Sequence, residues 1–399
     1  MQEFLDSLIA QGYFPGVRWD VVYFGGMLVF AAIVLLVFIL LVAGGTTFVE
    51  RRVWARIQSR VGPNRVGPQG ILQWLVDGIK LLMKEDIIPA AADRYLFMFA
   101  PYVVMVGFIG AFVVVPFGSR LIIADMNVGI LYITSVTALV VVGILMAGWA
   151  SNNKWSLIGG IRSAAQIVSY EIPAALSIFP VVLMSGTLSM QSLIQGQGWA
   201  PWDWYVFASP FTFVAFFIFF TSALAEGNRT PFDLPEAESE LVAGFVTEYS
   251  GVRYLMFFMA EWGNLYIIGA IVTTLFLGGW HIPPVTDNVV AQTVLEFVTI
   301  FVKSYFWVLV AMWIRATLPR TRVDQLMSVC WKYLVPISFV NILGAALWVL
   351  VFPYGFWPMH WLLFGLSLFI IGYFFSRVVF HLRRARVRER DQYQFSPLS

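Results

Sequence analysis

Long apolar runs constrain this chain more than any other feature of its sequence. Nine of them follow one another, at 21–45, 95–117, 128–149, 171–190, 205–226, 254–280, 291–314, 333–352 and 359–380. A helix needs about 20 mostly apolar residues to cross the hydrocarbon core of a bilayer. Because only helices and closed barrels satisfy their backbone groups in lipid, the runs predict an all-α, polytopic integral membrane protein with about nine transmembrane helices.

The composition excludes a soluble enzyme and most redox centres. Charged residues make up 12% of the 399 residues, whereas soluble proteins carry about 25%. The single cysteine, Cys330, excludes a disulfide and any cysteine-ligated iron–sulfur or structural zinc site within the chain. Three histidines are too few for two bis-histidine haems. We therefore expect one transmembrane domain over 1–380, with no metal site.

Lysine and arginine are distributed unevenly between alternate connections. If the N-terminus is placed outside, the inward segments hold 22 of the 25 Lys and Arg, and the outside receives only Arg18 and Arg120. Inward-facing loops of membrane proteins carry this excess. The count predicts an N-out, C-in topology, with residues 381–399 forming a basic tail on the inner side, which is the cytoplasmic, matrix or stromal side.

The first inward connection contains an amphipathic segment. Arg52, Arg56 and Arg60 recur at every fourth position, which would line one helix face but is also what ordinary positive flanking produces. Two Gly-Pro pairs then predict turns. Residues 71–85 have polar side chains on one face and apolar ones on the other, so they predict an interfacial amphipathic helix. The turn and this helix could form an opening between lipid and an attached protein.

The third inward connection is acidic. Between 226 and 248 it holds six carboxylates against one arginine, Arg229. An exposed acidic loop is common, but prolines stiffen this segment and the stretch 241–246 is apolar enough to dip towards the membrane. Carboxylates held together at low dielectric have raised, coupled pKa values and exchange protons near neutral pH, as a proton path requires.

Ionisable residues within the spans are functional candidates, because a charge at that depth needs a partner or a wet cavity. Glu261 lies about two turns into its span, and Lys303 lies near the middle of another. Glu171 precedes Pro173 and is equally consistent with an interfacial position. Glu296 is closer to the outer end, where we expect it to face water.

Five strings carry a family resemblance: ERRVWARIQSRVGPNRVGPQG, SNNKWSLIGGIRSAAQIVSYEIP, AEGNRTPFDLPEAESELVAGFVTEYSG, FFMAEW and LPRTRVDQLMSVCWKYLVP. With them the chain resembles the H subunit of the proton-pumping NADH:quinone oxidoreductase, respiratory complex I, whose mitochondrial counterpart is subunit 1 of NADH dehydrogenase. The resemblance runs from about residue 20 to about residue 350. The last apolar run and the basic tail lie beyond it, as in some bacterial members. The resemblance therefore implies the inner or plasma membrane of a prokaryote, with the basic tail in the cytoplasm.

The resemblance implies a subunit that is catalytic only within its complex, a translocase. In this family the subunit joins the membrane arm to the peripheral arm and forms the entrance and much of the tunnel for ubiquinone or menaquinone. FMN and iron–sulfur clusters belong to partner subunits, so this chain is expected to bind no redox cofactor. The expected partners are the other subunits of complex I, membrane lipid and quinone, with no nucleic acid.

The resemblance also implies two sets of residues. The quinone-chamber set contains Glu50, Arg51, Arg60, Arg162, Arg229, Arg315 and Arg320. The proton-path set contains Glu171, Glu226, Asp233, Glu236, Glu238, Glu240, Glu248, Glu261 and Lys303. A guanidinium positions a quinone headgroup or a carboxylate through fixed donors.

Two alternatives stay open. The chain could be the equivalent subunit of a membrane-bound hydrogenase or of a ferredoxin- or deazaflavin-dependent quinone reductase, although the intact acidic loop favours a quinone-linked complex. It could also be a stand-alone proton or cation transporter. A transporter is expected to show repeated halves and midplane sites, whereas the charges here gather on one side.

Overall fold

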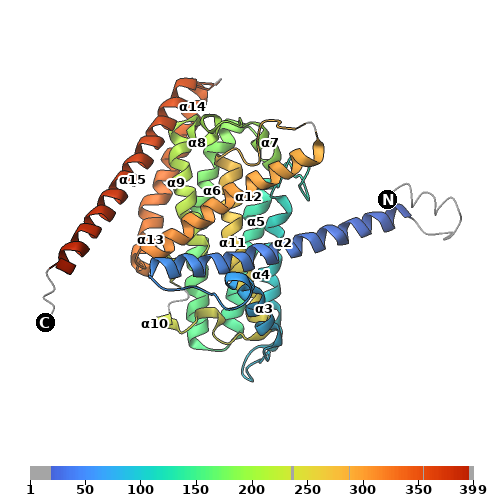
Figure 1. The fold of residues 1–399 in the computed structure, drawn as a ribbon. Coiled ribbons are helices and arrows are strands. Elements are labelled where there is room, and N and C mark those ends of the chain that lie inside the picture. Colours follow the sequence, from blue (N-terminus) through green and yellow to red (C-terminus); the bar gives the residue numbers. More distant parts are fainter. Residues whose placement is uncertain (1–18, 235–237, 287, 354, 395–399) are drawn as a thin grey trace.

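Helices alone form the regular structure of the described residues, in agreement with the all-α prediction (Figure 1). The computed structural model describes residues 19–234, 238–286, 288–353 and 355–394, with side chains for 33, 35–234, 240–286, 288–353 and 355–380. The side chains of Glu236, Glu238 and the predicted basic tail, 381–399, therefore lie outside the described part.

The long helices are α2 (Trp19–Ile57), α4 (Arg94–Val114), α5 (Gly129–Ala150), α6 (Lys154–Ser185), α9 (Pro210–Glu226), α11 (Gly251–Phe276), α12 (Val289–Thr317), α14 (Val335–Val351) and α15 (Trp357–Gln394). The short ones are η1 (Pro68–Gly70), α3 (Gln73–Met83), α7 (Met190–Gln195), η2 (Pro201–Asp203), α8 (Tyr205–Ala208), α10 (Glu238–Leu241), η3 (Gly244–Val246) and α13 (Val323–Ser328). A π-helical segment, η4 (Val329–Leu334), joins α13 to α14.

Within the described residues, seven helices are long and apolar enough to cross a membrane. They coincide with the second, third, fourth, sixth, seventh, eighth and ninth predicted runs. The first run lies in α2, a helix of 39 residues, and α9 is apolar but has only 17 residues. Most of these helices run side by side, while α2 crosses them at a large angle (Figure 1).

Two predicted spans have different bounds in the structure. The fourth is predicted at 171–190, but α6 begins at Lys154 and ends at Ser185. Its first turns carry polar residues that a hydropathy reading assigns to a loop, although Asn153 caps the helix by accepting from the Trp155 amide at 3.0 Å. The fifth run, 205–226, is interrupted at Ser209, which starts α9 by a reciprocal capping box with Thr212.

Buried hydrogen bonds hold the segment from α13 to α14 against α6. The Tyr170 hydroxyl donates to the Leu326 carbonyl at 2.9 Å, and the Cys330 thiol donates to the Ser169 carbonyl at 3.0 Å. Asn341 on α14 donates to the Phe211 carbonyl on α9. Because a buried polar group without a partner is costly, these bonds also fix the register of the helices.

An aromatic cluster closes the space between α2, α4, α11 and α12. Its centre is Phe38, whose ring meets five others at centroid distances from 5.2 to 6.5 Å: Phe112, Phe117, Tyr266, Phe297 and Phe301. Edge-to-face contacts of this kind add to the free energy gained by burying the rings. Phe117, which follows the last residue of α4, lies at one edge of the cluster.

Helix α15 contacts the bundle mainly through its first half. The Trp202 and Trp361 rings stack with centroids 5.0 Å apart, and Phe364 meets Phe207 edge to face. The Trp202 carbonyl lies 2.9 Å from Nδ1 of His360. These contacts place α15 beside η2 and α8, from which it slants away along the bundle (Figure 1).

We expect Gly159→Ala to lower stability by about 1–3 kcal/mol, because overpacking a tight contact costs that much. A Cβ at Gly159 would lie 2.6 Å from the Cα of Gly244, where α6 meets η3, and backbone cannot move aside as a flexible side chain can. Gly365→Ala is the control, since its Cβ would meet nothing within 4 Å. Thermal unfolding of the purified protein measures both, and equal midpoints for the two variants would contradict the close contact.

Candidate functional site

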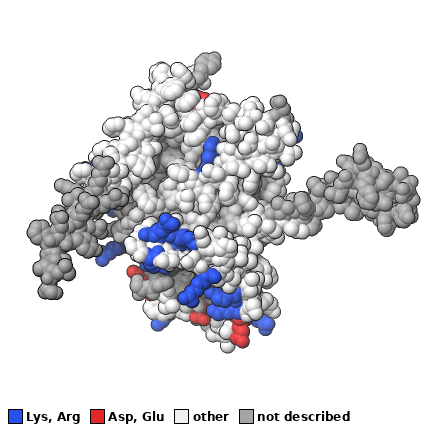
Figure 2. Space-filling view, in the orientation of Figure 1, with Lys and Arg blue, Asp and Glu red and all other residues white. Residues whose placement is uncertain are grey.

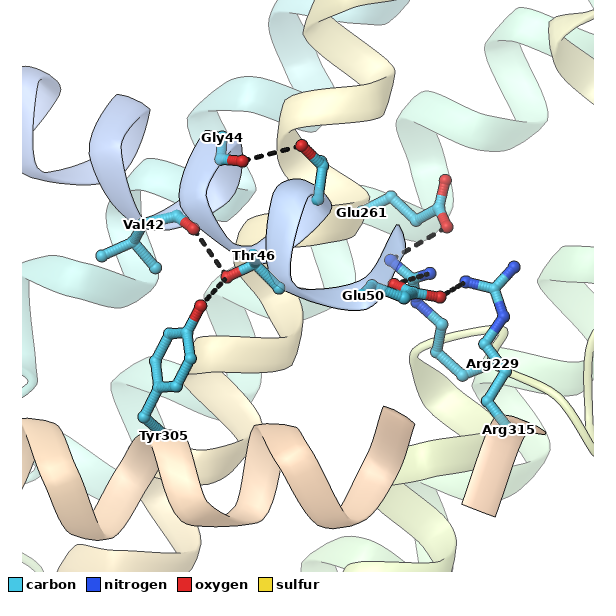
Figure 3. Close-up of polar contacts among 9 residues, drawn as sticks. Val42, Gly44, Thr46, Glu50, Arg229, Glu261, Tyr305 and Arg315 are labelled. Carbon is cyan, nitrogen blue, oxygen red and sulfur yellow. Dashed lines mark hydrogen bonds and ion pairs between the residues drawn. The ribbon is translucent and has the colours of Figure 1, made fainter. Parts of the chain in front are cut away.

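Four charged side chains meet inside the bundle (Figure 3). The Glu50 carboxylate accepts a hydrogen bond from Arg315 at 2.6 Å and lies 3.9 Å from the Arg229 guanidinium. Arg229 also forms an ion pair with Glu261 at 3.1 Å. Only 2% of Arg229 and 4% of Glu50 are exposed. We name Glu50, Arg229, Glu261 and Arg315 the charge cluster.

Four separate segments supply the charge cluster. Glu50 comes from α2, Glu261 from α11 and Arg315 from the last turn of α12, while Arg229 follows α9. The Arg229 guanidinium also lies over the Trp262 ring, 4.2 Å from its centroid. Two carboxylates and two guanidinium groups neutralise one another, which is the condition for burying charges at acceptable cost.

One turn before Glu50, Thr46 links α2 to α12. Its hydroxyl donates to the Val42 carbonyl at 2.6 Å and shares a hydrogen bond of 3.3 Å with the Tyr305 hydroxyl (Figure 3). The Thr47 hydroxyl donates to the Gly44 carbonyl at 2.7 Å. These bonds hold the stretch of α2 that presents Glu50.

The loop after α9 is held by polar contacts from two directions. The Gln166 amide on α6 donates to the carbonyls of Ala225 and Phe232 at 2.8 and 2.7 Å. Asp233 accepts from Arg320 at 3.1 Å. Burial raises the pKa of the Asp233 carboxyl above its ordinary value, although the Arg320 charge opposes this shift. The part of the loop at 227–234 is therefore an ordered part of the site.

Two cavities meet at Phe258 and Trp262. The first, which we name the α3 cavity, has a volume of about 120 Å³ between α2, α3 and α11, and Arg51 and Asp77 are the charged residues in its largely apolar lining. The second, the Arg315 cavity, has a volume of about 190 Å³ and borders Arg315 and Glu261. Both are lined by Phe258 and Trp262, so they adjoin one another.

Two further cavities continue from Glu261 into the bundle. The Glu226 cavity, of about 70 Å³, lies between α4, α5 and α11 and is bordered by both Glu261 and Glu226. The Glu171 cavity, of about 40 Å³, is bordered by Glu226 and Glu171. The two share Thr137, Glu226, Asn264 and Ile267 in their linings. Three carboxylates thus border these two neighbouring cavities.

The remaining predicted residues lie outside the charge cluster. Arg51 is exposed and pairs with Asp77 at the α3 cavity. Arg162 and Glu240 pair with each other at 2.7 Å. Of the others, Arg60 is exposed and donates to Gln58, Glu248 accepts from Asn153, and Arg320 pairs with Asp233.

Lys303 lies apart from the carboxylates of the site. Its ammonium group donates to the carbonyls of Leu277 and Gly279 at 3.0 and 3.1 Å and lies 4.6 Å from the Trp204 ring centroid. These carbonyls follow the last residue of α11, where a cation interacts favourably with the helix dipole. The contacts are those of a C-terminal helix cap.

The expectation that Glu296 faces water is wrong. Only 5% of the residue is exposed, and its carboxylate accepts from both the amide and the hydroxyl of Ser119 at 2.7 Å. The sequence reasoning also missed Trp262 and Asn264, which border the cavities. Trp262 ends the FFMAEW string and Asn264 lies within one turn of Glu261 on α11, but neither side chain is ionisable, so neither was singled out.

No group of three or more His, Cys, Asp and Glu among the described residues is arranged to hold a metal ion. Cys330, the one cysteine of the sequence, is buried beside α6. The described part of the chain therefore does not offer the donor set of an iron–sulfur cluster.

These features define a polytopic helical membrane protein in which a buried charge cluster joins a largely apolar cavity to a line of carboxylates. A sequence model described as NADH dehydrogenase matches residues 30–346 of the chain. The chain belongs to this family.

Bacterial relatives support the same assignment. The chain is 56% identical over 332 residues to the H subunit of NADH-quinone oxidoreductase from Anaeromyxobacter dehalogenans, a match that covers 79% of this chain and 80% of the relative. It is 47% identical to the H subunit of the Chlorobium luteolum enzyme, over 82% of this chain and 90% of the relative. Subunit 8 of the Rhodothermus marinus enzyme is 42% identical, over 78% and 94%. The predicted resemblance is confirmed, and with it a membrane subunit of NADH-quinone oxidoreductase.

Proposed function

We propose that this chain admits quinone from the membrane to a chamber beside its charge cluster and starts the proton path of the complex. The observation that carries the proposal is the series of four adjoining cavities from α3 to Glu171. Glu261 borders both the Arg315 cavity and the Glu226 cavity, so it stands where the two functions would meet.

The first two cavities fit the chemistry of a quinone. A quinone has a long apolar tail and a headgroup with two carbonyl oxygens, and the α3 cavity has an apolar lining with charges only at Arg51 and Asp77. Arg315 borders the next cavity, and its Nε makes no hydrogen bond with the described residues. A guanidinium at this place would hold a headgroup oxygen and stabilise the negative charge of a reduced quinone.

The last two cavities fit the movement of protons. Volumes of about 70 and 40 Å³ each have room for one or more water molecules, since one water needs about 10–15 Å³ of such space. Water in these cavities would connect Glu261, Glu226 and Glu171 into one path. Glu236 and Glu238 stay in the proposed path on the resemblance alone, and the contacts of Lys303 favour a structural role for it.

The other parts of the proposal follow from the family. Electrons would come from partner subunits that hold FMN and iron–sulfur clusters, so no electron-transfer step is assigned to a residue here. Lys and Arg gather over the end of the bundle that carries α3 and α10 (Figure 2). This supports docking of the peripheral arm there, with that end inward, the N-terminus outside and the chain in the plasma membrane.

The quinone route is tested by Ile79→Lys. Ile79 lines the α3 cavity, so a lysine there would place a charge among apolar side chains and obstruct the proposed entrance. Because 44% of Ile79 is exposed, the ammonium group would stay in contact with solvent at the entrance, where it opposes entry of the apolar quinone tail. We expect NADH:quinone reduction by the complex to fall about tenfold, which corresponds to about 1.4 kcal/mol of added barrier. NADH:ferricyanide reduction, which requires only the peripheral arm, should be unchanged.

Ile79→Leu is the matched control, because it keeps the apolar lining and volume and should retain nearly full activity. Equal quinone reduction by the lysine and leucine variants would contradict a quinone route through this cavity. A parallel loss of ferricyanide reduction would indicate a failure of assembly, which gel filtration of the complex reports independently.

A further inference from the structure

A fifth hollow lies on the other face of α2 and is not used by the proposed quinone or proton paths. It has a volume of about 240 Å³ and is lined by Phe48, Val49, Arg52, Val53, Arg56, Gln69 and Ile71. The lining residues of α2 recur at the spacing of one helix face, whereas Glu50 faces the charge cluster on the opposite side. We name this the Arg52–Arg56 hollow.

The charges of the hollow are not neutralised within the described residues. Arg52 donates to the carbonyls of Pro63 and Gln69 and lies 5.3 Å from the centroid of the Phe48 ring, so its guanidinium is held in place. Arg56 is exposed. In the described part of the chain neither arginine pairs with a carboxylate, since Glu50 is bound to the charge cluster and Asp77 to Arg51.

The floor of the hollow is apolar, and its position fits the edge of a membrane. Phe48, Val53 and Ile71 supply apolar surface beside the two guanidinium groups. The first predicted span ends at Gly45, so Phe48 follows it within one turn. Because α2 crosses the other helices at a large angle, its next turns stay near the same level along the axis of the helix bundle (Figure 1). Ile71 begins the amphipathic segment predicted for the interface.

We propose that the Arg52–Arg56 hollow binds the phosphodiester headgroup of an anionic phospholipid. The two arginines contact the phosphate oxygens, and the first carbons of an acyl chain lie over Phe48, Val53 and Ile71. Arg52 is held by its two carbonyl bonds through Nη2, which leaves Nη1 for a phosphate oxygen, and the exposed Arg56 contacts the phosphate from the other side. A carboxylate of a partner protein or free phosphate would match the charges but leave the apolar floor unoccupied.

The test uses photolabelling of the whole complex. The complex is placed in phosphatidylcholine nanodiscs that contain a small fraction of phosphatidylglycerol with a diazirine on the first acyl carbons, or of phosphatidylcholine with the same label. After irradiation, mass spectrometry measures labelling of the peptides that carry residues 48–56 and 69–71. We expect labelling by phosphatidylglycerol to exceed labelling by phosphatidylcholine about fivefold for each arginine contact.

The matched variants are Arg56→Gln and Arg65→Gln. Both remove one positive charge from the same connection, but only Arg56 lines the hollow. We expect labelling by phosphatidylglycerol to fall about fivefold in Arg56→Gln and to stay unchanged in Arg65→Gln. Arg56→Lys, which keeps the charge, should recover most of the labelling.

Three results would overturn the proposal. The first is equal labelling by the two lipids, which would show that no headgroup is selected. The second is loss of the labelling in excess inorganic phosphate, which would identify a site for the free anion. The third is labelling that appears only after the peripheral arm is removed, which would show that a partner protein occupies the hollow.

Discussion

Replacing Arg229 with methionine is expected to destabilise the chain by about 3–5 kcal/mol, the usual cost of breaking a buried ion pair from one side. Methionine fills a similar volume, so the loss would come from charge and not from a cavity. Glu50 would keep Arg315, but Glu261 would lose its ion-pair partner in the charge cluster. We expect little of this variant to be recovered in the complex, and no quinone reduction by what is recovered.

A double variant tests whether the lost stability comes from the unpaired charge of Glu261. Glu261→Gln combined with Arg229→Met removes both members of a pair, and it should recover much of the stability that the single variant loses. The unfolding midpoint of the complex and the amount of chain recovered in membranes measure this. If the double variant were as unstable as the single one, the packing of Arg229 over Trp262 would be the main contribution.

Replacing Asn264 with leucine is expected to slow coupled quinone reduction about a hundredfold, the lower end of what a positioned proton transfer contributes. Asn264 borders both the Glu226 and the Glu171 cavity, at the neck where they adjoin. Leucine has nearly the same size but offers no hydrogen bond, so water at the neck would lose a partner. NADH:ferricyanide reduction should stay unchanged, because it does not depend on the proton path.

Two variants separate proton transfer from packing at the neck. Asn264→Ser keeps a hydrogen-bonding group and should recover a large part of the rate, whereas Ile267→Leu changes an apolar residue of the same neck and should have little effect. A larger solvent deuterium isotope effect in Asn264→Leu than in the natural chain is also expected. Normal proton pumping and normal rate in this variant would rule out a path through the neck.

Hydropathy located most of the helices but not their ends. The runs 95–117 and 128–149 match α4 and α5 closely, because an apolar run ends where the membrane ends. Helix α6 begins at Lys154 because Asn153 caps it there, and polar side chains further along, such as Gln166, hydrogen-bond to the backbone of neighbouring segments. Hydropathy indicates whether a segment lies in an apolar or a polar environment. It does not indicate the residue at which a helix begins or ends.

The resemblance named the charged residues of the cluster but not how they pair. The resemblance assigns Glu50 to the chamber and Glu261 to the proton path, yet both contact Arg229 in one cluster. Their pairing depends on the crossing of α2 with α11 and α12, which the spacing of residues in one sequence does not encode. Burial of Glu296 was missed for the same reason, since its partner, Ser119, is 177 residues away in the chain.

The rings around Phe38 have an electrical consequence. They fill the space between α2, α4, α11 and α12 with low-dielectric hydrocarbon, in which a hydrated ion would lose several kcal/mol of solvation. Ions would therefore not cross the protein at this place, and part of any voltage across the membrane would fall over the rings. In the proposed orientation, with the α3 end inward, a proton that reaches the charge cluster from that side would not pass the rings, so the rings would keep the two solutions electrically separate.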